Sequence, residues 1–593
     1  MSYRAPVSDI AFTLRHIAGL DREIGRGVFG DLSADLVEAV LEEAGKFASE
    51  EIAPLNAPGD KFGTPLKDGV VTMPPGWKEA YARWIEGGWA SLTGPEEFGG
   101  QALPTMLAIA TQEMWNSGSM AYGIGPTLTF GAIEAINAHA SEALKQKYLA
   151  KLVSGEWMGT MNLTEPQAGS DLALLRTRAE PRGDGSYSIE GTKIFITYGE
   201  HDFTDNIVHL VLARLPDAPA GTRGISLFLV PKFFVNDDGS LGERNDVWCR
   251  SVEHKLGIHA SPTCVMGYGD NGGAIGWLVG EENRGLACMF TMMNNARLSV
   301  GIQGVAIAER AYQQALAYAH ERRQGRLPGM GQDEAVAIVA HPDIRRDLMT
   351  MRALTAAARA ICYQTAAATD LAHRLADEGE RRAAQERANL LTPLAKAFST
   401  DIGVEVASMG VQVHGGMGFI EETGAAQHLR DARIAPIYEG TNGIQAIDLV
   451  TRKLPMSGGE AVKAYIGELR DTAREVSESN QPAFGRMGAR LNETLDALEK
   501  ATAWMYGALK DNPDHALAGA TPYLRLFSLA GGGAALAKGA LVAHGLDASP
   551  ANAARIATAR FFAENVCPAA DGLAETVIGG ADVVLDTDAA LAS

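Results

Sequence analysis

The sequence contains few cysteines, and none of them form a closely spaced pair. The five cysteines among 593 residues are odd in number, widely spaced and without a CxxC motif. This pattern argues against a disulfide framework and against a zinc site, and it is typical of proteins from a reducing compartment. The sequence therefore predicts no metal site and a cytoplasmic location.

Long apolar runs and positive charge are also lacking. No apolar run approaches the ~20 residues that span a bilayer, and the apolar N-terminal stretch is interrupted by Asp9 and two arginines, unlike a signal peptide. The formal charge is −20, which disfavours non-specific binding to nucleic acid or anionic membranes. We expect no membrane span and no nucleic-acid partner, although local basic residues can still bind phosphates.

Several common motifs are missing. The chain has no GxxxxGK[ST] phosphate loop, no HExxH zinc motif, no GxSxG nucleophile elbow and no strand–GxGxxG–helix fingerprint. The GGMG segment at 415–418 has the wrong spacing and lies within helical sequence. Nucleotide binding by a doubly wound domain is therefore not supported, and a cofactor that contains a nucleotide must be held in another way.

The hydrophobic pattern changes from helical to β and back to helical. Residues 33–52 have apolar residues at three- and four-residue spacing, with Ser33 as a plausible N-cap. Short segments rich in β-branched and aromatic residues follow at 187–197, 206–215, 224–233 and 272–280. After Arg284 the pattern is helical again, with a linker expected at 456–459 and a glycine-rich break at 531–533.

This pattern predicts an α+β fold with four domains. They are an N-terminal helical domain (1–158), a middle β domain (159–283), a C-terminal helical bundle (284–455) and an additional helical domain (456–593).

Three groups of segments carry chemical information. The loop NLTEPQAGSD at 162–171 offers many N–H and hydroxyl groups, which suit an anion or the polar edge of a ring. ERRQGR at 321–326 supplies arginines for a pyrophosphate, and HGGMGF at 414–419 allows close backbone approach. Each segment alone also fits an ordinary capped loop, a solvated helix end or a tight turn.

A single carboxylate, Glu439, lies in IYEGTNGIQ at 437–445. Burial next to Ile437 and Tyr438 would raise its pKa and make it a usable base near neutral pH. Gly440 would let a flat ligand come close. From spacing alone, a loop carboxylate that caps the next helix is the favoured interpretation.

Together, the segments TEPQAGSD, FIT, ERRQGR, GGMGF and IYEGTNGIQ have the order found in the acyl-CoA dehydrogenase family, which this sequence resembles from about residue 33 to 454. The terminal additions and HPDIRRDLMTMRA at 341–353 are similar to the longer branch that acts on 3-methylmercaptopropionyl-CoA. The resemblance implies the family's fold: a helical domain, a β domain, a helical bundle and, in this branch, an extra helical domain.

The resemblance also implies bound FAD, held by two sets of residues. One set would contact the isoalloxazine ring: Met161, Leu163, Thr164, Gly169, Ser170, Phe195, Ile196 and Thr197. The other set, from a neighbouring subunit, would contact the pyrophosphate and adenosine: Arg322, Gln324, Gln412, Val413, His414, Gly415 and Gly416. Thr441 and Gly443 match further flavin contacts. A homodimer or homotetramer is therefore expected.

By the same resemblance Glu439 is the catalytic base. Some relatives place the base immediately before the arginine matched here by Arg297, but that position is Ala296, which cannot accept a proton. Residues that match acyl-CoA contacts are Ser170, Asn294, Arg297 and Gly440. The expected reaction is α,β-dehydrogenation of an acyl-CoA thioester, with electron-transferring flavoprotein as the acceptor of the electrons.

Alternative functions remain at this point. An acyl-CoA oxidase would have the same motifs. A DNA-associated flavoprotein of this fold should have a basic C-terminal surface, whereas residues 456–593 have 11 Lys and Arg against 17 Asp and Glu. A purely structural helical protein would not explain five ordered motifs. No residue reports the acyl chain, so 3-methylmercaptopropionyl-CoA and ordinary short- to long-chain acyl-CoAs have equal weight.

Overall fold

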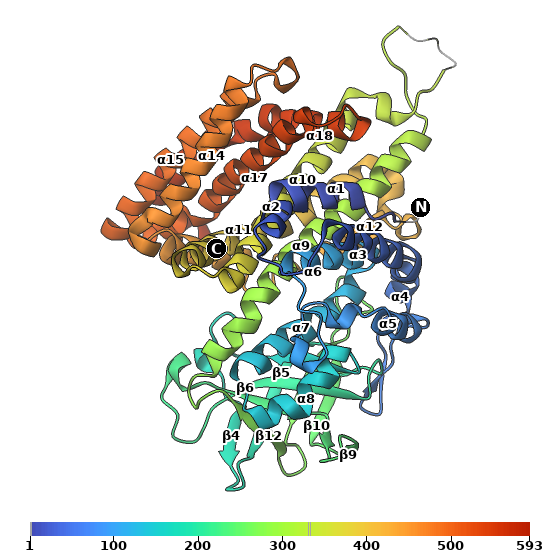
Figure 1. Ribbon diagram of the computed structural model, residues 1–593, viewed down its shortest axis with the longest axis vertical. Coiled ribbons are helices and arrows are strands. Elements are labelled where there is room, and N and C mark those ends of the chain that lie inside the picture. Colours follow the sequence, from blue (N-terminus) through green and yellow to red (C-terminus); the bar gives the residue numbers. More distant parts are fainter. Residues whose placement is uncertain (1–2, 330, 332–333, 593) are drawn as a thin grey trace.

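The computed structural model describes residues 3–329, 331 and 334–592, and for Asn294 only the backbone. The β domain lies at one end of the molecule and the helices after residue 460 lie at the other (Figure 1). The long helix α9 reaches the β domain, and α10 and α11 pack on α9 and on the C-terminal helices. The N-terminal helices pack beside them (Figure 1).

The N-terminal part of the chain is helical. Its helices are α1 (Val7–Phe12), α2 (Leu20–Gly25), α3 (Ala34–Phe47), α4 (Asn56–Phe62), α5 (Trp77–Glu86), α6 (Thr105–Gly118), α7 (Met120–His139) and α8 (Glu142–Ser154). The predicted N-cap of α3 is confirmed, because the Ser33 hydroxyl accepts a hydrogen bond from the Leu36 N–H at 3.2 Å. Beyond Phe47 the helix continues as a π-helical turn to Ile52, close to the predicted end.

The β domain is built on one eight-stranded sheet. Its strands are β3 (Trp157–Asn162), β4 (Arg178–Pro181), β5 (Tyr187–Thr197), β6 (Asn206–Ala213), β7 (Ser226–Pro231), β10 (Val247–Val252), β11 (Thr263–Tyr268) and β12 (Ala274–Val279). The order is β10-β11-β5-β12-β7-β6-β3, with β4 paired to β5. Two small hairpins complete the strands: β1 (Leu66–Lys67) with β2 (Val70–Val71), and β8 (Phe233–Val235) with β9 (Leu241–Arg244).

Every residue of β3, β6 and β7 is buried. The helices α7 and α8 pack on β3, α9 packs on β7, and the three strands pair with each other. Such strands have no polar alternation. Strands at β6 and β7 were predicted from their β-branched and aromatic residues, whereas β3, with the sequence WMGTMN, has few of these and was missed. The expected domain boundary between residues 158 and 159 falls within β3, and the boundary between 283 and 284 falls just before α9.

Three long helices form the central bundle. They are α9 (Gly285–Glu321), α10 (Pro342–Arg374) and α11 (Glu378–His414), and two short helices follow, α12 (Ala425–Ala432) and α13 (Asn442–Asp448). Glycines on α9 allow it to lie against α11: a Cβ at Gly304 would stand 2.2 Å from the Ser399 carbonyl oxygen. This close contact fixes the relative position of the two helices that flank Glu439.

The remaining helices form a further bundle at the end of the chain. They are α14 (Glu460–Glu478), α15 (Met487–Asp511), α16 (Pro513–Ala518), α17 (Ala520–Gly545), α18 (Pro550–Phe561), α19 (Ala570–Gly579), α20 (Ala581–Leu585) and α21 (Asp588–Leu591). The helices α17 and α18 pack on α10, and α17 also contacts α11 and α13. The expected linker at 456–459 is a short 3-10 turn, with Ser457 and Gly458 at positive φ.

The predicted break at residues 531–533 is wrong, because α17 runs through these glycines without interruption. A Cβ at Gly532 would stand 2.9 Å from the Ala357 Cβ in α10, and one at Gly533 would stand 3.0 Å from Leu491 in α15. The glycines therefore serve close helix packing rather than a turn, and burial offsets their poor helix propensity.

The expectation that no segment approaches a membrane span also needs correction. By length and composition α17 qualifies, with a mean hydropathy of 1.5 over its most apolar window. However, 83% of that window is buried inside the molecule, which is the usual property of a core helix. Its apolar character is explained by contacts with α10, α14, α15 and α19.

Candidate functional site

Glu439 lies in a tight turn between α12 and α13. Both Glu439 and Gly440 have positive φ, 55° and 79°. The Gln445 side chain holds the turn, since its Nε2 donates to the carbonyl oxygens of Glu439 and Gly440, both at 3.3 Å. A Cβ at residue 440 would lie 2.8 Å from this Nε2. The turn therefore requires glycine at 440 and keeps Glu439 in an unfavourable backbone conformation.

Thr441, and not Glu439, caps the following helix. The Thr441 hydroxyl accepts a hydrogen bond from the Ile444 N–H at 3.2 Å. Within the described part of the chain, the Glu439 carboxylate accepts no hydrogen bond and the Glu439 N–H donates none. The interpretation of Glu439 as a helix cap is thus wrong, and both its carboxylate and its N–H remain available to a ligand.

Burial and nearby cations set the protonation of Glu439. Burial raises the pKa of the Glu439 carboxyl above its usual range, while the charges of Arg297 and Lys396 act against that rise. The two cations favour the ionised form, but among the described residues neither donates a hydrogen bond to the carboxylate, so its oxygens stay free to accept a proton. A carboxylate of raised pKa that remains unpaired is suited to accept a proton from carbon.

Lys396 supports this turn from α11. Its Nζ donates to the Gly440 carbonyl oxygen at 2.8 Å and to the Asn442 Oδ1 at 2.9 Å. The Asn442 amide donates in turn to Asp401 Oδ1 at 2.7 Å. Sequence reasoning missed these three residues, because Lys396 lies 43 positions before Glu439 and its helix shows no local motif.

Arg297 lies on α9 and faces the same turn. In the described part of the chain its guanidinium makes one long ion pair, 4.0 Å from Nη1 to Asp448 Oδ2, and its buried Nε has no partner. The preceding Ala296 is buried in the helix and offers no proton acceptor. Asn294, the other expected substrate contact on α9, has a side chain outside the described atoms.

The loop 162–171 is organised by a buried ion pair. Lys193 Nζ donates to Glu165 Oε1 at 2.8 Å and to the Leu163 carbonyl oxygen at 3.0 Å. Glu165 also accepts the backbone N–H groups of Arg176 and Thr177 at 2.7 and 3.0 Å. Burial alone would raise the pKa of Glu165, but Lys193 and these hydrogen bonds outweigh burial and hold the pKa at about 2. Sequence reasoning did not identify this pair.

The expected ring-binding residues of this loop and of β5 lie together. The Ile194 N–H donates to the Thr164 carbonyl oxygen at 2.9 Å, and the Thr160 hydroxyl donates to the Thr197 carbonyl oxygen at 2.7 Å. Phe195 is 58% exposed, whereas the next residue, Ile196, is buried. Met161, in β3, is buried. In the loop that follows, Leu163 and Thr164 are partly buried, and Gly169 and Ser170 are exposed.

The second expected set lies at the far end of α9. His414 is buried, stacks on Tyr318 with ring centroids 4.4 Å apart, and thereby brings 321–326 beside 412–416. Of this set, Val413 is also buried, and the exposed members are Arg322, Gln324, Gln412, Gly415 and Gly416. Among the described residues the Arg322 guanidinium has no hydrogen-bond or ion-pair partner.

One chain does not bring this second set beside Glu439. Arg322, at the end of α9, follows Arg297 by 25 residues in the same helix, a separation of about 37 Å at 1.5 Å per residue. Within one chain the two sets are therefore too far apart to bind the same ligand together. One ligand can contact both sets only if a second chain contributes one of them.

The residues present fit FAD. Exposed Phe195 offers a ring face, and the unpartnered Arg322 guanidinium offers a bidentate site for a diphosphate. A Cβ at Gly415 or at Gly416 would meet no other atom within 4 Å, so this backbone is open to a ligand. Near Glu439 the unpartnered buried atoms are Arg297 Nε, Gln303 Nε2 and Gln445 Oε1.

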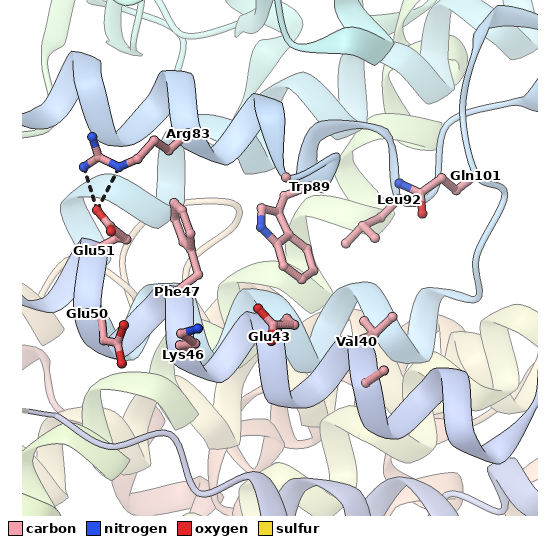
Figure 2. A pocket seen from close by; sticks show the side chains of 12 residues that line it. Val40, Glu43, Lys46, Phe47, Glu50, Glu51, Arg83, Trp89, Leu92 and Gln101 are labelled. Carbon is pink, nitrogen blue, oxygen red and sulfur yellow. Dashed lines mark hydrogen bonds and ion pairs between the residues drawn. The ribbon is translucent and has the colours of Figure 1, made fainter.

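A large open groove lies elsewhere on the molecule. It has a volume of about 470 Å³ and separates α3 from the segment 83–101 (Figure 2). Figure 2 shows Arg83 pointing at Glu51, with the Phe47 and Trp89 rings between the two walls. The groove contains none of the predicted site residues, so its size alone gives it no role in the chemistry.

Comparison with protein families covers nearly the whole chain. Residues 35–156, 160–270 and 283–454 match the models for the N-terminal, middle and C-terminal domains of acyl-CoA dehydrogenase. Residues 465–588 match the model described as acetyl-CoA dehydrogenase C-terminal like.

Individual relatives share both length and fold. The 3-methylmercaptopropionyl-CoA dehydrogenase of Ruegeria pomeroyi is 50% identical, over 95% of this chain and 96% of its own. A butyryl-CoA dehydrogenase of Syntrophomonas wolfei is 34% identical, over 96% of both chains. The crystal structure of an acyl-CoA dehydrogenase of Bacillus anthracis complexed with FAD has a TM-score of 0.74 at 22% identity, covering 93% of this chain and 89% of that one.

Proposed function

Because the chain belongs to the acyl-CoA dehydrogenase family and is a FAD-dependent oxidoreductase, we propose that it dehydrogenates 3-methylmercaptopropionyl-CoA, with Glu439 as the base. The product is then 3-methylthioacryloyl-CoA, formed by loss of a proton from the α-carbon and a hydride from the β-carbon. The observation that carries the proposed base is the unpaired Glu439 carboxylate between two cations.

Glu439 performs the proton transfer. Its raised pKa makes the carboxylate a stronger base than an exposed glutamate, and the charges of Arg297 and Lys396 limit that rise. The rigid turn around Gly440 holds the carboxylate in one orientation, and this lowers the entropic cost of reaching the α-proton.

The backbone of the turn assists the same step. A thioester α-proton is weakly acidic, and removal of it places negative charge on the thioester oxygen. The Glu439 N–H makes no internal hydrogen bond among the described residues and can donate to this oxygen. Donors fixed in advance stabilise such developing charge without reorganisation.

The two residue sets described above would hold FAD. Phe195 and the loop after Met161 would cover the ring, and Arg322 with the glycines at 415 and 416 would bind the diphosphate. When bound, FAD supplies the hydride acceptor for the substrate's β-carbon. Thr441 and Gly443, next to the base, are the remaining expected contacts.

The substrate is proposed from the relative that shares half of its residues with this chain over nearly the full length. A second candidate is a short-chain acyl-CoA such as butyryl-CoA, which is favoured by the 34% identity to a butyryl-CoA dehydrogenase of the same length. Steady-state kcat/KM values for 3-methylmercaptopropionyl-CoA, butyryl-CoA and longer acyl-CoAs test the choice. A preference of tenfold or more for the methylthio substrate supports it, and a preference for butyryl-CoA contradicts it.

We also propose a homodimer in which each flavin contacts both chains. The separation of about 37 Å between Arg297 and Arg322 along α9 supports this arrangement, as do the exposed side chains of Met417 and Phe419 in the diphosphate segment, which are 48% and 86% exposed. A fully active monomer in sedimentation would contradict it.

Electron-transferring flavoprotein is the proposed electron acceptor, and the cytoplasm is the proposed location. The five cysteines are all free and buried, in keeping with a reducing compartment. An oxidase would discharge the enzyme on oxygen instead, so oxygen consumption with substrate and without the acceptor separates the two activities.

A further inference from the structure

The turn that carries Glu439 rests on a fully buried lysine. Lys396 has no exposed surface, yet its ammonium group points at the Gly440 carbonyl oxygen and the Asn442 side chain, at 2.8 and 2.9 Å. A buried lysine is costly to maintain and is normally found only where its charge is compensated. No carboxylate oxygen lies within ion-pair distance of Lys396 in the described residues.

The lysine belongs to a small polar network on α11. The Asn442 Nδ2 donates to the Thr400 hydroxyl at 3.0 Å, to the Ala397 carbonyl oxygen at 3.1 Å and to Asp401 Oδ1 at 2.7 Å. Two residues of the turn, Gly440 and Asn442, are therefore tied to α11 by hydrogen bonds. A satisfied buried network of this kind fixes a single backbone conformation.

Charged groups from three helices and the turn surround this network. Lys396 faces Glu439 from the turn, Asp401 on its own helix and Arg297 on α9. Asp401 in turn faces Arg525 on α17 and Glu405 on α11. Arg297 and Lys396 are the two cations that act on Glu439. Arg297 also makes a 4.0 Å ion pair with Asp448, whereas Lys396 makes no ion pair in the described part of the chain.

We propose that Lys396 is a positioning residue for Glu439: its hydrogen bond to Gly440 fixes the turn, and its charge keeps the Glu439 carboxylate ionised. The inference rests on the proposed function, because it assumes that Glu439 is the base. It assigns two separable effects to one side chain, one on geometry and one on the pH at which the base works.

The protonation of Lys396 supports this role. Burial lowers the pKa of the lysine to about 7, against the opposing influence of Glu439 and Asp401. The lysine is thus charged in the acid range, where Glu439 would otherwise take up a proton. Because Glu439 and Lys396 interact, the acid limb of the pH–rate profile reports an apparent pKa of both groups together. Loss of the lysine charge must therefore shift the pH of this limb.

The test compares four variants of the holoenzyme. Lys396→Gln keeps a hydrogen-bond donor for Gly440 but removes the positive charge, whereas Lys396→Arg keeps the charge. Asn442→Ala keeps Lys396 but removes the hydrogen bonds that the Asn442 side chain makes with α11. Lys538→Gln is the matched control, since Lys538 is also a largely buried lysine that donates to a backbone carbonyl, Ile17 O at 3.2 Å, but it does not face Glu439.

The rate of anaerobic flavin reduction by substrate is measured from pH 5 to 9, and the flavin spectrum of the substrate-free enzyme is titrated over the same range. FAD content and circular dichroism check folding. We expect the acid limb of Lys396→Gln to lie at higher pH than that of wild type, because loss of a nearby positive charge raises the pKa of Glu439. Lys396→Arg and Lys538→Gln should keep the wild-type limb.

Asn442→Ala should lose about 10- to 100-fold in rate through misplacement of the base, without movement of the limb. An unchanged limb in Lys396→Gln, or an equal shift in Asn442→Ala, would overturn the proposal. If Lys396→Gln does not fold, the test rests on Asn442→Ala. A shift of the acid limb in that variant, which keeps the Lys396 charge, would contradict a role for this charge. A different result would refute the proposed function itself: Glu439→Gln would keep its activity. The outcomes for the Lys396 and Asn442 variants refute only the role of Lys396.

Discussion

Lys396 donates a hydrogen bond of 2.8 Å to the carbonyl oxygen of Gly440, the residue that follows Glu439. A helix that begins 61 positions before the base thereby controls the base's backbone. The relation explains how a glutamate with φ of 55° stays in place, since a strained residue persists only where its surroundings over-determine it.

Gly440→Ala should reduce the rate of flavin reduction by at least about 100-fold. The new Cβ would lie 2.8 Å from Gln445 Nε2, and alanine is disfavoured at φ of 79°. The control is Gly467→Ala on α14, where a Cβ meets no atom within 4 Å. Stopped-flow absorbance with both proteins measures the effect, and equal rates in the two variants would refute the described turn.

Glu165→Gln should lower the thermal midpoint and loosen FAD. It leaves the buried Lys193 uncompensated, which costs about 3–5 kcal/mol. The pKa of Glu165 is about 2 in the folded chain, against about 4.3 when unfolded. Its stabilising effect is therefore present above pH about 4.3 and is lost as the pH falls towards 2.

The measurement for this ion pair is the melting temperature of wild type and Glu165→Gln between pH 3 and 7. The difference between the two proteins should shrink as the pH falls below about 4. A Lys193→Met, Glu165→Gln double variant should lose less stability than the sum of the single changes. A difference that stays constant with pH would contradict the assigned protonation.

Arg322→Ala should weaken FAD retention more than it slows the reconstituted enzyme. The guanidinium is exposed and has no partner among the described residues, and it is expected to bind the diphosphate of FAD, far from the reacting carbons. Arg382→Ala is the control, because this arginine is 82% exposed on α11 and has no predicted ligand. FAD content after gel filtration is the measurement. Equal retention in both variants would remove Arg322 from the site.

Gly532→Ala should destabilise the docking of α17 on α10 by about 1–3 kcal/mol, because its Cβ would lie 2.9 Å from that of Ala357. The same change at Gly507 on α15 meets no atom within 4 Å and should stabilise the protein slightly. Thermal denaturation of the two variants gives opposite signs if the helix packing is as described.

The sequence predicted the parts of the fold whose pattern is local. β5 was predicted with its observed bounds, because it is rich in β-branched and aromatic residues and lies between clear turn signals. The strand β3 was missed because its sequence, WMGTMN, has few β-branched or aromatic residues. The short strands β10 and β11 were missed because they lie between irregular segments. The glycines at 531–533 were read as a break because the facing residues, such as Ala357, are distant in sequence.

For the candidate site, ordered motifs identified Glu439 and the loop 162–171, because each is a contiguous segment. The residues that hold these segments could not be predicted in this way. Lys193 and Lys396 become important only through burial and through contacts made across the fold. A lysine in a strand or helix is usually exposed, so its type alone gave no signal.

Glu439→Gln in the purified holoenzyme tests the central claim most directly. Glutamine keeps the size of the side chain and the backbone N–H, but its amide cannot accept the α-proton. We predict normal FAD content and normal acyl-CoA binding, with anaerobic flavin bleaching slowed by at least about 10⁴-fold, the upper range for loss of a positioned base. Partial rescue by a further Ala296→Glu change would support the geometry. Bleaching at a near-normal rate in Glu439→Gln would mean that the base lies elsewhere.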